Sequence, residues 1–233
     1  MIFCLASVLI FLAPAAGAAV KAKPVLKTEK QKASYGIGVS WARNLKMHGV
    51  SVDMGALVKG LEDGLSGSKL LMTDAEINTT LSKFSKELIE KKEKAEKEEA
   101  LKNEKAGEAF LAANKKEKGV VVLPDGLQYK VLKAGHGKKP GKNEYAVVYG
   151  RGTLINGKVF FNSKTAGRPT PLLVGGMIRG LNEALQMMPV GSKWRIFIPS
   201  KLAYGERRGG SRIIGPGSTL IFDVKLVSIR KTE

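Results

Sequence analysis

The sequence predicts an α+β protein in which a helical front half is followed by a β-rich domain. Apolar residues before Gly119 recur at helical spacing, and no proline interrupts residues 73–118. After Gly119, short apolar segments with strand-like alternation are separated by Gly and Pro. Asn156-Gly157 lies between two of these segments and is the strongest hairpin signal in the chain.

Composition narrows the chemistry before any single element is considered. The 233 residues are 43% hydrophobic and carry a formal net charge of +18, which indicates a chain with a buried core and an anionic partner. The single cysteine, Cys4, excludes an intrachain disulfide and a multi-cysteine metal site. Two histidines, His48 and His136, leave little room for a histidine-built metal centre, so we expect neither a metal nor a cofactor.

The first domain boundary is expected near residue 19, because residues 1–19 have the pattern of a secretory signal peptide. An apolar run from Ile2 to Leu12 is followed by the small residues Ala16-Gly17-Ala18. The run is too short to cross the roughly 30 Å core of a bilayer as a helix. No Lys or Arg precedes it, which leaves an uncleaved anchor as the alternative to a cleaved signal peptide.

Three helices are predicted before Gly119. The first ends near Gly49, and the second begins at a Ser51 cap and ends at a Gly/Ser turn over residues 66–68. The third opens with a capping box, in which Thr73 and Glu76 exchange hydrogen bonds, and extends to about residue 117.

The apolar faces of these helices predict association. The third helix has one apolar stripe, formed by Ile77, Leu81, Phe84 and Leu88. Residues 73–118 carry 11 basic and 11 acidic residues, so we expect the part after the stripe to be a solvated spacer that does not bind nucleic acid. Because the three helices hold too little apolar surface for a core of their own, we expect residues 20–72 and the start of this helix to form a homodimer through residues 29–90. Packing within one chain is the alternative.

Residues 119–233 are predicted to form a compact domain of strands with one helix. The helix is expected over 178–188, with Leu181, Leu185 and Met188 on one face. Strands are expected over residues 127–132, 145–149, 154–155, 159–161, 194–198 and 220–226. The domain has one His, no Cys and only six acidic residues, which disfavours nucleophile–base pairs and paired catalytic carboxylates. Its apolar residues beside Gly/Pro turns form either a core alone or a core with an apolar pocket.

Four segments of this domain together resemble the FKBP-type peptidyl-prolyl isomerase domain. They are residues 147–157, 180–191, 198–205 (Ile-Pro-Ser-Lys-Leu-Ala-Tyr-Gly) and 215–226, in the family's order. Residues 35–40 and 57–67 are similar to the helical dimerisation region of bacterial macrophage-infectivity-potentiator (Mip)-like members. The resemblance implies an antiparallel half-barrel sheet wrapped on one short helix, with 73–118 as the linking helix and 119–233 as the isomerase domain. It also implies a periplasmic or cell-envelope enzyme that isomerises X-Pro bonds in unfolded or nascent polypeptides, and that binds macrolide ligands of immunophilins.

The resemblance carries a set of pocket residues onto this chain. The implied catalytic residues are Tyr149, Phe160, Tyr204 and Phe222, and the implied substrate-binding residues are Met177, Ile178, Leu181, Ile213 and Ile214. The hydroxyl of Tyr204 is expected to bond a substrate carbonyl. Leu181 stands where most active members have the tryptophan of the pocket floor, which makes the expected pocket shallower.

Two local registers stay open in the sequence. The family reads Tyr-x-Gly, whereas Tyr149 and Gly152 are one residue too far apart, so Gly150 is either an inserted bulge, which we favour, or the residue at the tyrosine position. Counting to Pro169 puts Phe161 at the family's aspartate, whereas a local shift puts Asn162 there. Neither register supplies a carboxylate.

Two functions of different class follow from these residues. The first is an exported prolyl isomerase that assists the folding of envelope proteins, supported by the intact Leu-Ala-Tyr-Gly segment. The second is an FKBP-like chaperone or binding module with weak or lost isomerase activity, supported by Leu181 and the missing carboxylate. Residues 119–233 carry 19 basic and 6 acidic residues, so the excess charge is expected to form a basic rim on this domain, and nucleic-acid binding is disfavoured.

Overall fold

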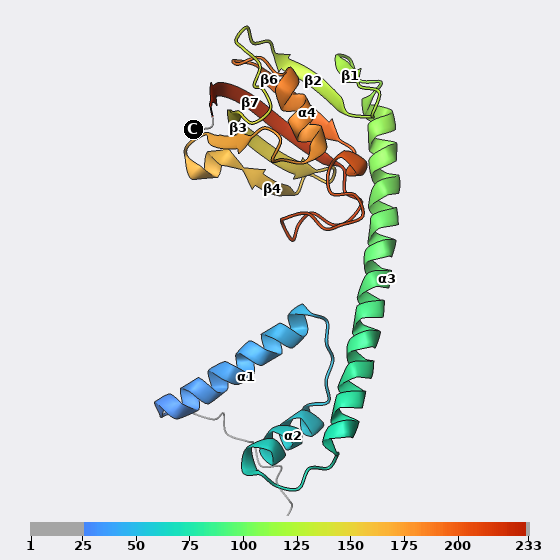
Figure 1. Cartoon of the computed structure of the whole chain (residues 1–233), viewed down its shortest axis with the longest axis vertical. Coiled ribbons are helices and arrows are strands. Elements are labelled where there is room, and N and C mark those ends of the chain that lie inside the picture. The colour runs from blue at the N-terminus through green and yellow to red at the C-terminus, as the bar shows by residue number, and fades with distance from the viewer. Residues whose placement is uncertain (1–25, 232–233) are drawn as a thin grey trace, which may run out of the picture. The chain divides into compact units, whose positions relative to one another are not determined.

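The computed structural model describes residues 26–231, without the side chains of Lys164 and Ala166 (Figure 1). The chain divides into two compact units, one ending at Thr73 and one beginning at Asp74. The predicted signal peptide lies outside the described residues. Within the described part, no helix is both long enough and apolar enough to cross a membrane.

Residues 26–73, the described part of the first unit, contain two helices, α1 (Glu29–Met47) and α2 (Met54–Ser66). The side chain of Thr28 caps α1 by accepting the N–H of Gln31, and Gln31 completes a capping box. The predicted Ser51 cap of α2 is wrong, because Asp53 accepts the N–H of Ala56 at 2.8 Å and the helix begins two residues later. The predicted turn after α2 is confirmed: Gly67 ends the helix with a φ of 67°, a left-handed conformation that glycine adopts without strain.

Most large apolar side chains of α1 and α2 are exposed in the part of the chain that the structure describes. Tyr35 is 62% exposed, Trp41 52% and Leu65 87%. The buried residue of α2 is Asp63, whose carboxylate forms an ion pair with Lys59 one turn earlier. Residues 26–73 of the first unit therefore present apolar surface and have no apolar core of their own.

The second unit begins with a long helix, α3 (Asp74–Asn114), which ends three residues before the predicted end. Its C-terminal half differs from the expected solvated spacer. Ala100 and Gly107 are buried, and the ring of Phe110 lies 6.0 Å from that of Phe197 in the sheet. Small residues make this face easy to miss, because they give no apolar stripe but let the helix approach the sheet closely.

An open antiparallel sheet of seven strands follows α3, and all the predicted strands occur in it. The strands are β1 (Val120–Val122), β2 (Gln128–Lys133), β3 (Tyr145–Leu154), β4 (Val159–Asn162), β5 (Thr170–Leu173), β6 (Lys193–Ile198) and β7 (Leu220–Arg230). Their order is β1-β2-β6-β7-β3-β4, and β5 pairs with the first half of β3 (Figure 1). The hairpin is confirmed, since Leu154 donates its N–H to the Lys158 carbonyl at 3.0 Å and Gly157 has a φ of 81°.

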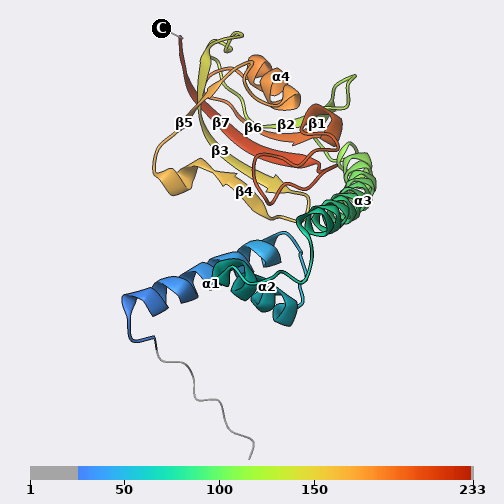
Figure 2. The same cartoon turned by 60° about the horizontal axis from the view of Figure 1, so that its bottom comes forward.

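The core of this domain lies between the sheet and α4 (Arg179–Met187), which crosses one face of the sheet (Figure 2). Leu181, Leu185 and Met188 are buried, as their spacing predicts. They pack with sheet residues such as Val148, Ile196 and Val224. We call the face covered by α4 the inner face and the opposite one, which Phe197 shares with Phe110 of α3, the outer face.

Candidate functional site

Two aromatic rings meet on the inner face of the sheet, on either side of β3. Phe160 of β4 and Phe222 of β7 pack edge to face, with ring centroids 5.3 Å apart and planes at 79°. Gly152 lies between them on β3, and a Cβ atom there would stand 2.5 Å from the Phe160 ring and 3.1 Å from the Phe222 ring. Glycine at this position is what allows the two rings to form one apolar wall.

The N-terminal end of α4 supplies a second wall. Leu181 is buried against the core, and Ile178, the residue before the helix, is half-buried on it. Asn182 fixes this end: its Oδ1 accepts the N–H of Met177 at 3.3 Å, and its Nδ2 donates to the Met177 carbonyl at 2.6 Å. The backbone of Met177 is therefore satisfied within the chain, and its side chain lies exposed at the rim.

The loop between the 3-10 turn η2 (Ser200–Leu202) and β7 supplies the third wall. Ile214 is buried in the same core cluster as Phe222 and Leu181. Gly209 brings Tyr204 beside it, because a Cβ on Gly209 would stand 2.8 Å from both the Ile214 Cβ and the Tyr204 ring. Tyr204 and Ile213 are 37% and 44% exposed, so they lie at the open side of the cluster.

Tyr149 does not join this cluster, and the preferred bulge at Gly150 is wrong. β3 pairs with β7 without interruption from Val148 to Leu154, and the irregularity lies between Val147 and Val148, where Val227 is the extra residue on β7. Because side chains alternate along a strand, Gly150 and Gly152 share the inner face with Val148, whereas Tyr149 lies on the outer face. Gly150 therefore occupies the position that the resemblance assigns to the tyrosine.

The ring of Phe161 lies over Gly150. A Cβ on Gly150 would stand 3.0 Å from the Phe161 ring, and Phe161 packs on the core while Asn162 is exposed. An irregular register in β4, where Gly152 faces Phe161 and Thr153 faces Val159, places both phenylalanines on the core side. The structure thus places Phe161, and not Asn162, on the core side over Gly150.

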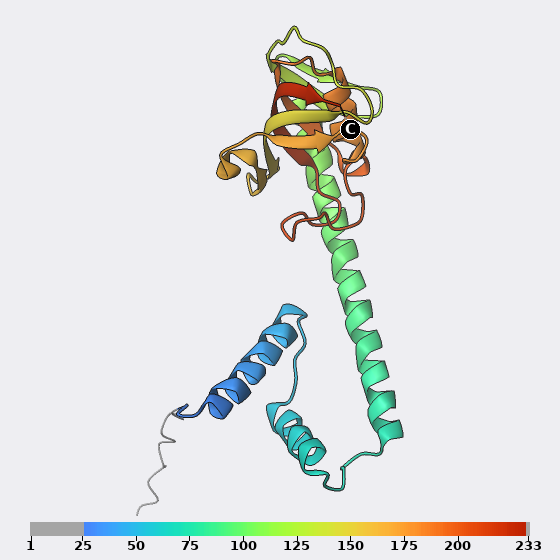
Figure 3. The same cartoon turned by 60° about the vertical axis from the view of Figure 1, so that its left-hand side comes forward.

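The loop that carries Tyr204 and Ile214 is held against α3 (Figures 1 and 3). The guanidinium of Arg208 forms ion pairs with Glu96 at 3.1 Å and Glu99 at 2.5 Å. Asn103 donates from Nδ2 to the Pro216 carbonyl at 2.8 Å. These contacts were not predicted, because the two glutamates and the asparagine look like ordinary solvated helix residues until the loop is placed beside them.

Two carboxyl groups lie close together at the start of α4. Burial and the neighbouring Asp125 raise the pKa of Glu183. Burial also opposes ionisation of Asp125, but the Leu127 N–H donates a hydrogen bond to its Oδ1 at 3.1 Å, and this bond together with the nearby Glu183 and Arg179 leaves its pKa below the ordinary value. Arg179 lies 3.9 Å from Asp125. This end of the helix therefore holds one carboxylate and one carboxyl that resists ionisation.

Known protein families match most of the chain, including both compact units. A family model described as "FKBP-type peptidyl-prolyl cis-trans isomerase" matches residues 136–227, and one described as "Domain amino terminal to FKBP-type peptidyl-prolyl isomerase" matches residues 30–131. The chain is 46% identical over 206 residues to "Outer membrane protein MIP" of Legionella longbeachae, covering 88% of each chain. It is 40% identical over 215 residues to "Peptidyl-prolyl cis-trans isomerase Mip" of Coxiella burnetii, covering 92% of this chain and 93% of that one. The crystal structure of FkpA from Escherichia coli matches with a TM-score of 0.65 and 33% identity, over 90% of this chain and all of that chain.

Proposed function

The chain belongs to the FKBP-type peptidyl-prolyl cis-trans isomerases with a Mip-like amino-terminal domain, and from this premise we propose that the apolar cluster on the inner face is its proline site. The observation that carries the proposal is the convergence of four separate segments. Phe160, Phe222, Leu181 and Ile214 come from β4, β7, α4 and the loop before β7, and all pack on one cluster.

The chemistry of X-Pro isomerisation suits such a cluster. The barrier of about 18–20 kcal/mol comes from amide resonance, and the reaction makes and breaks no covalent bond. An apolar pocket that holds the prolyl ring and strips water from the amide favours the twisted transition state. We assign the ring contacts to Phe160, Phe222 and Leu181.

Two polar groups at the open side can orient the substrate. Tyr204 is partly exposed at the open side of the cluster, and its hydroxyl can donate to a peptide carbonyl. The N–H of Ile178 has no acceptor among the described residues, so it can donate to a second carbonyl. Both donors flank the apolar wall, as a site that grips a peptide around its proline requires.

A second candidate function is a binding module with a low isomerase rate. The contact between Gly150 and Phe161 favours it, because that contact fills the inner face with a ring where a polar pair would stand. Leu181 favours it as well, since leucine offers a prolyl ring less flat surface than tryptophan does.

A protease-coupled assay with a prolyl peptide separates the two candidates. Enzymatic function predicts a rate well above the uncatalysed one at micromolar protein, and a fall in kcat/KM of about tenfold in Tyr204→Phe, the worth of one hydrogen bond to the transition state. Tyr149→Phe is the matched control, since that hydroxyl lies on the outer face and its loss is expected to leave the rate unchanged. A rate equal to the uncatalysed one would leave only the binding module. If the rate is that low, the double variant Gly150→Tyr, Phe161→Asp is expected to isomerise the prolyl peptide faster than the wild type does.

We also propose that the protein is exported to the periplasm or cell envelope, acts there on proline-containing unfolded polypeptides, and works as a homodimer through residues 29–90. The exposed apolar side chains of α1, α2 and the stripe of α3 support association, because solvated Trp41, Leu65 and Leu81 are costly in a monomer. Macrolide ligands of immunophilins are expected to compete with peptide at the apolar cluster. Sedimentation of residues 20–233 at tens of micromolar tests the dimer, and a monomer mass there would refute it.

A further inference from the structure

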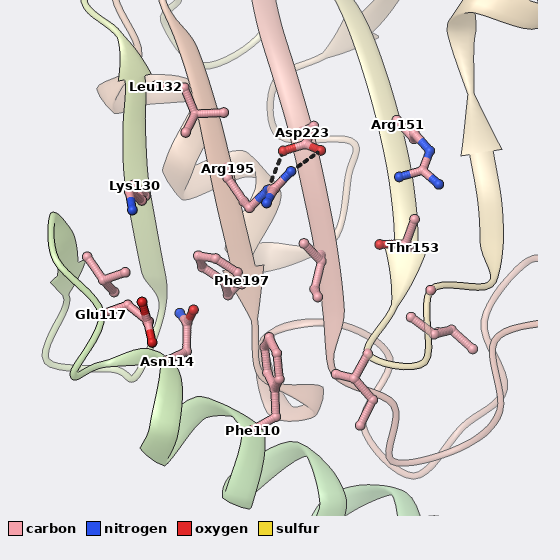
Figure 4. A pocket seen from close by; sticks show the side chains of 15 residues that line it. Phe110, Asn114, Glu117, Lys130, Leu132, Arg151, Thr153, Arg195, Phe197 and Asp223 are labelled. Atoms are coloured by element: carbon pink, nitrogen blue, oxygen red, sulfur yellow. Dashed lines mark hydrogen bonds and ion pairs between the residues drawn. The ribbon is translucent and has the colours of Figure 1, made fainter.

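A groove on the outer face of the sheet is separate from the proposed proline site. Its volume is about 450 Å³, and it lies where the end of α3 approaches strands β2, β6, β7 and β3 (Figure 4). None of the nine residues implied for the proline pocket lines it. The volume falls in the range of ordinary ligand pockets, about 300–1,000 Å³.

Beneath the groove, one row of residues paired across neighbouring strands is charged, and we call such a row a rung of the sheet. Lys130, Arg195, Asp223 and Arg151 lie in register on four adjacent strands. Asp223 accepts both the Nε of Arg195 at 2.6 Å and its terminal nitrogen at 2.9 Å. One carboxylate therefore faces three cations, and among the described residues Lys130 and Arg151 have no ion-pair partner (Figure 4).

The next rung is apolar at its centre. Phe197 and Ile221 lie in register, with Thr153 beside Ile221 on β3. Phe110 of α3 packs its ring against Phe197, which closes this side of the groove. Glu117 lines the groove from beyond the end of α3, so negative charge in a ligand is favoured at the Arg151 end (Figure 4).

The spacing of the two rungs specifies what fits. Residues two apart on one strand point to the same face and lie about 7 Å apart. An extended peptide has this same repeat, so an acidic side chain at one position and an apolar side chain two positions later can reach the charged and apolar rungs together.

We propose that this groove is a second polypeptide-binding site, which takes an extended segment with an acidic residue at position i and an aromatic or large aliphatic residue at i+2. The acidic group pairs with Arg151 in a fork of charge-assisted hydrogen bonds, and the apolar group covers the half-buried Ile221 beside Phe110. The site goes beyond the isomerase reaction, because it recognises no proline. Through this site the domain binds a client chain on the face of the sheet opposite the proposed proline site.

Fluorescence polarisation of the full chain with a labelled peptide tests the proposal. The probe is the proline-free peptide Gly-Asp-Ser-Phe-Gly, and two control peptides are Gly-Asn-Ser-Phe-Gly and Gly-Ser-Asp-Phe-Gly. The first control lacks the charge, and the second has adjacent side chains that point to opposite faces. Both are expected to bind about tenfold more weakly than the probe.

Two charge reversals on the same outer face complete the design. Arg151→Glu is expected to weaken the probe by about tenfold or more, because it replaces the cation with a like charge. Lys225→Glu on β7 makes the same change outside the groove lining and is expected to leave affinity within about twofold. The isomerase rate on a prolyl peptide, measured in parallel, reports whether each variant is folded.

Three results would overturn the proposal. They are equal binding of the three peptides, equal loss in Arg151→Glu and Lys225→Glu, and binding of an anionic detergent at Arg151 with none of the peptide. A low isomerase rate with intact, Arg151-dependent peptide binding would count against the proposed function alone, so the two failures are distinguishable.

Discussion

The N-terminal helices and the β-domain contain the same kinds of apolar residue but differ in what covers them. Leu181, Leu185 and Met188 of the β-domain are within 1% of full burial, whereas Tyr35 and Trp41 of α1 are more than half exposed. The repeat of apolar residues in the sequence is helical in both regions. Periodicity therefore identifies the face of a helix that needs a partner, and only the fold tells whether that partner is in the same chain.

The helix α3 contains both situations. Near its start, the large residues Leu81 and Phe84 are exposed, whereas near its end the small residues Ala100 and Gly107 are buried against the domain. The size of the side chain, and not only its hydrophobicity, decides how closely the helix can approach the β-domain. The second half of α3 thus packs on the β-domain, where it holds the loop of Tyr204 and Ile214 through Arg208.

The largest expected effect is the difference in unfolding free energy between a Leu→Ala change in the β-domain and one near the start of α3. Leu185→Ala removes a fully buried side chain and is expected to lower the free energy of unfolding by about 2–5 kcal/mol, through lost burial and a cavity. Leu81→Ala, at a residue 59% exposed, is expected to cost no more than about 0.5 kcal/mol in a dilute monomer. Urea unfolding measures both.

The same two variants are expected to differ in self-association at high protein concentration. Leu81→Ala is expected to weaken self-association in sedimentation, whereas Leu185→Ala is expected to leave it unchanged. Equal unfolding costs for the two variants at low concentration would mean that the apolar stripe of α3 is covered within one chain.

Replacing a glycine with alanine is expected to stabilise the protein in the N-terminal helices and to destabilise it where α3 packs on the β-domain. Alanine favours a helix over glycine by about 1 kcal/mol, so Gly60→Ala in α2, where no atom lies within 4 Å of an added Cβ, is expected to stabilise by up to that amount. Gly107→Ala in α3 places a Cβ into the buried Thr219 side chain and is expected to cost about 1–3 kcal/mol. Thermal denaturation of both variants checks the signs, and a stabilising Gly107→Ala would contradict the close packing of α3 on the domain.

Local features were largely predictable from the sequence. Asn156-Gly157 fixed the hairpin because the turn requires positive φ, and the spacing of Leu181, Leu185 and Met188 predicted the buried face of α4. The face on which Tyr149 lies was not predictable, because one residue of register inverts a strand and the irregularity sits on β7 at Val227. The outer groove was missed for a related reason: Lys130, Arg151, Arg195 and Asp223 are far apart in the sequence and meet only through strand order.

The smallest effect concerns the carboxyl pair of the β-domain, where burial acts on a charge and not on an apolar group. Because burial and Asp125 raise the pKa of Glu183, the native state favours its protonated form. That preference stabilises the protein at pH values below the ordinary range of a glutamate and is lost as the pH rises through the raised pKa. Glu183→Gln is neutral at every pH, so it is expected to match the wild type near pH 4 and to exceed it at pH 7, by no more than about 1 kcal/mol.

Asp125 acts in the opposite direction and is unchanged in this variant. Its lowered pKa gives stability above the ordinary range of an aspartate, which is lost as the pH falls. The measurement is therefore the difference in melting temperature between Glu183→Gln and the wild type at pH 4, 5.5 and 7. Glu108→Gln, on the exposed side of α3, controls for the loss of one negative charge. A difference that does not grow with pH, or that grows equally in Glu108→Gln, would show that burial at the start of α4 does not oppose ionisation of Glu183.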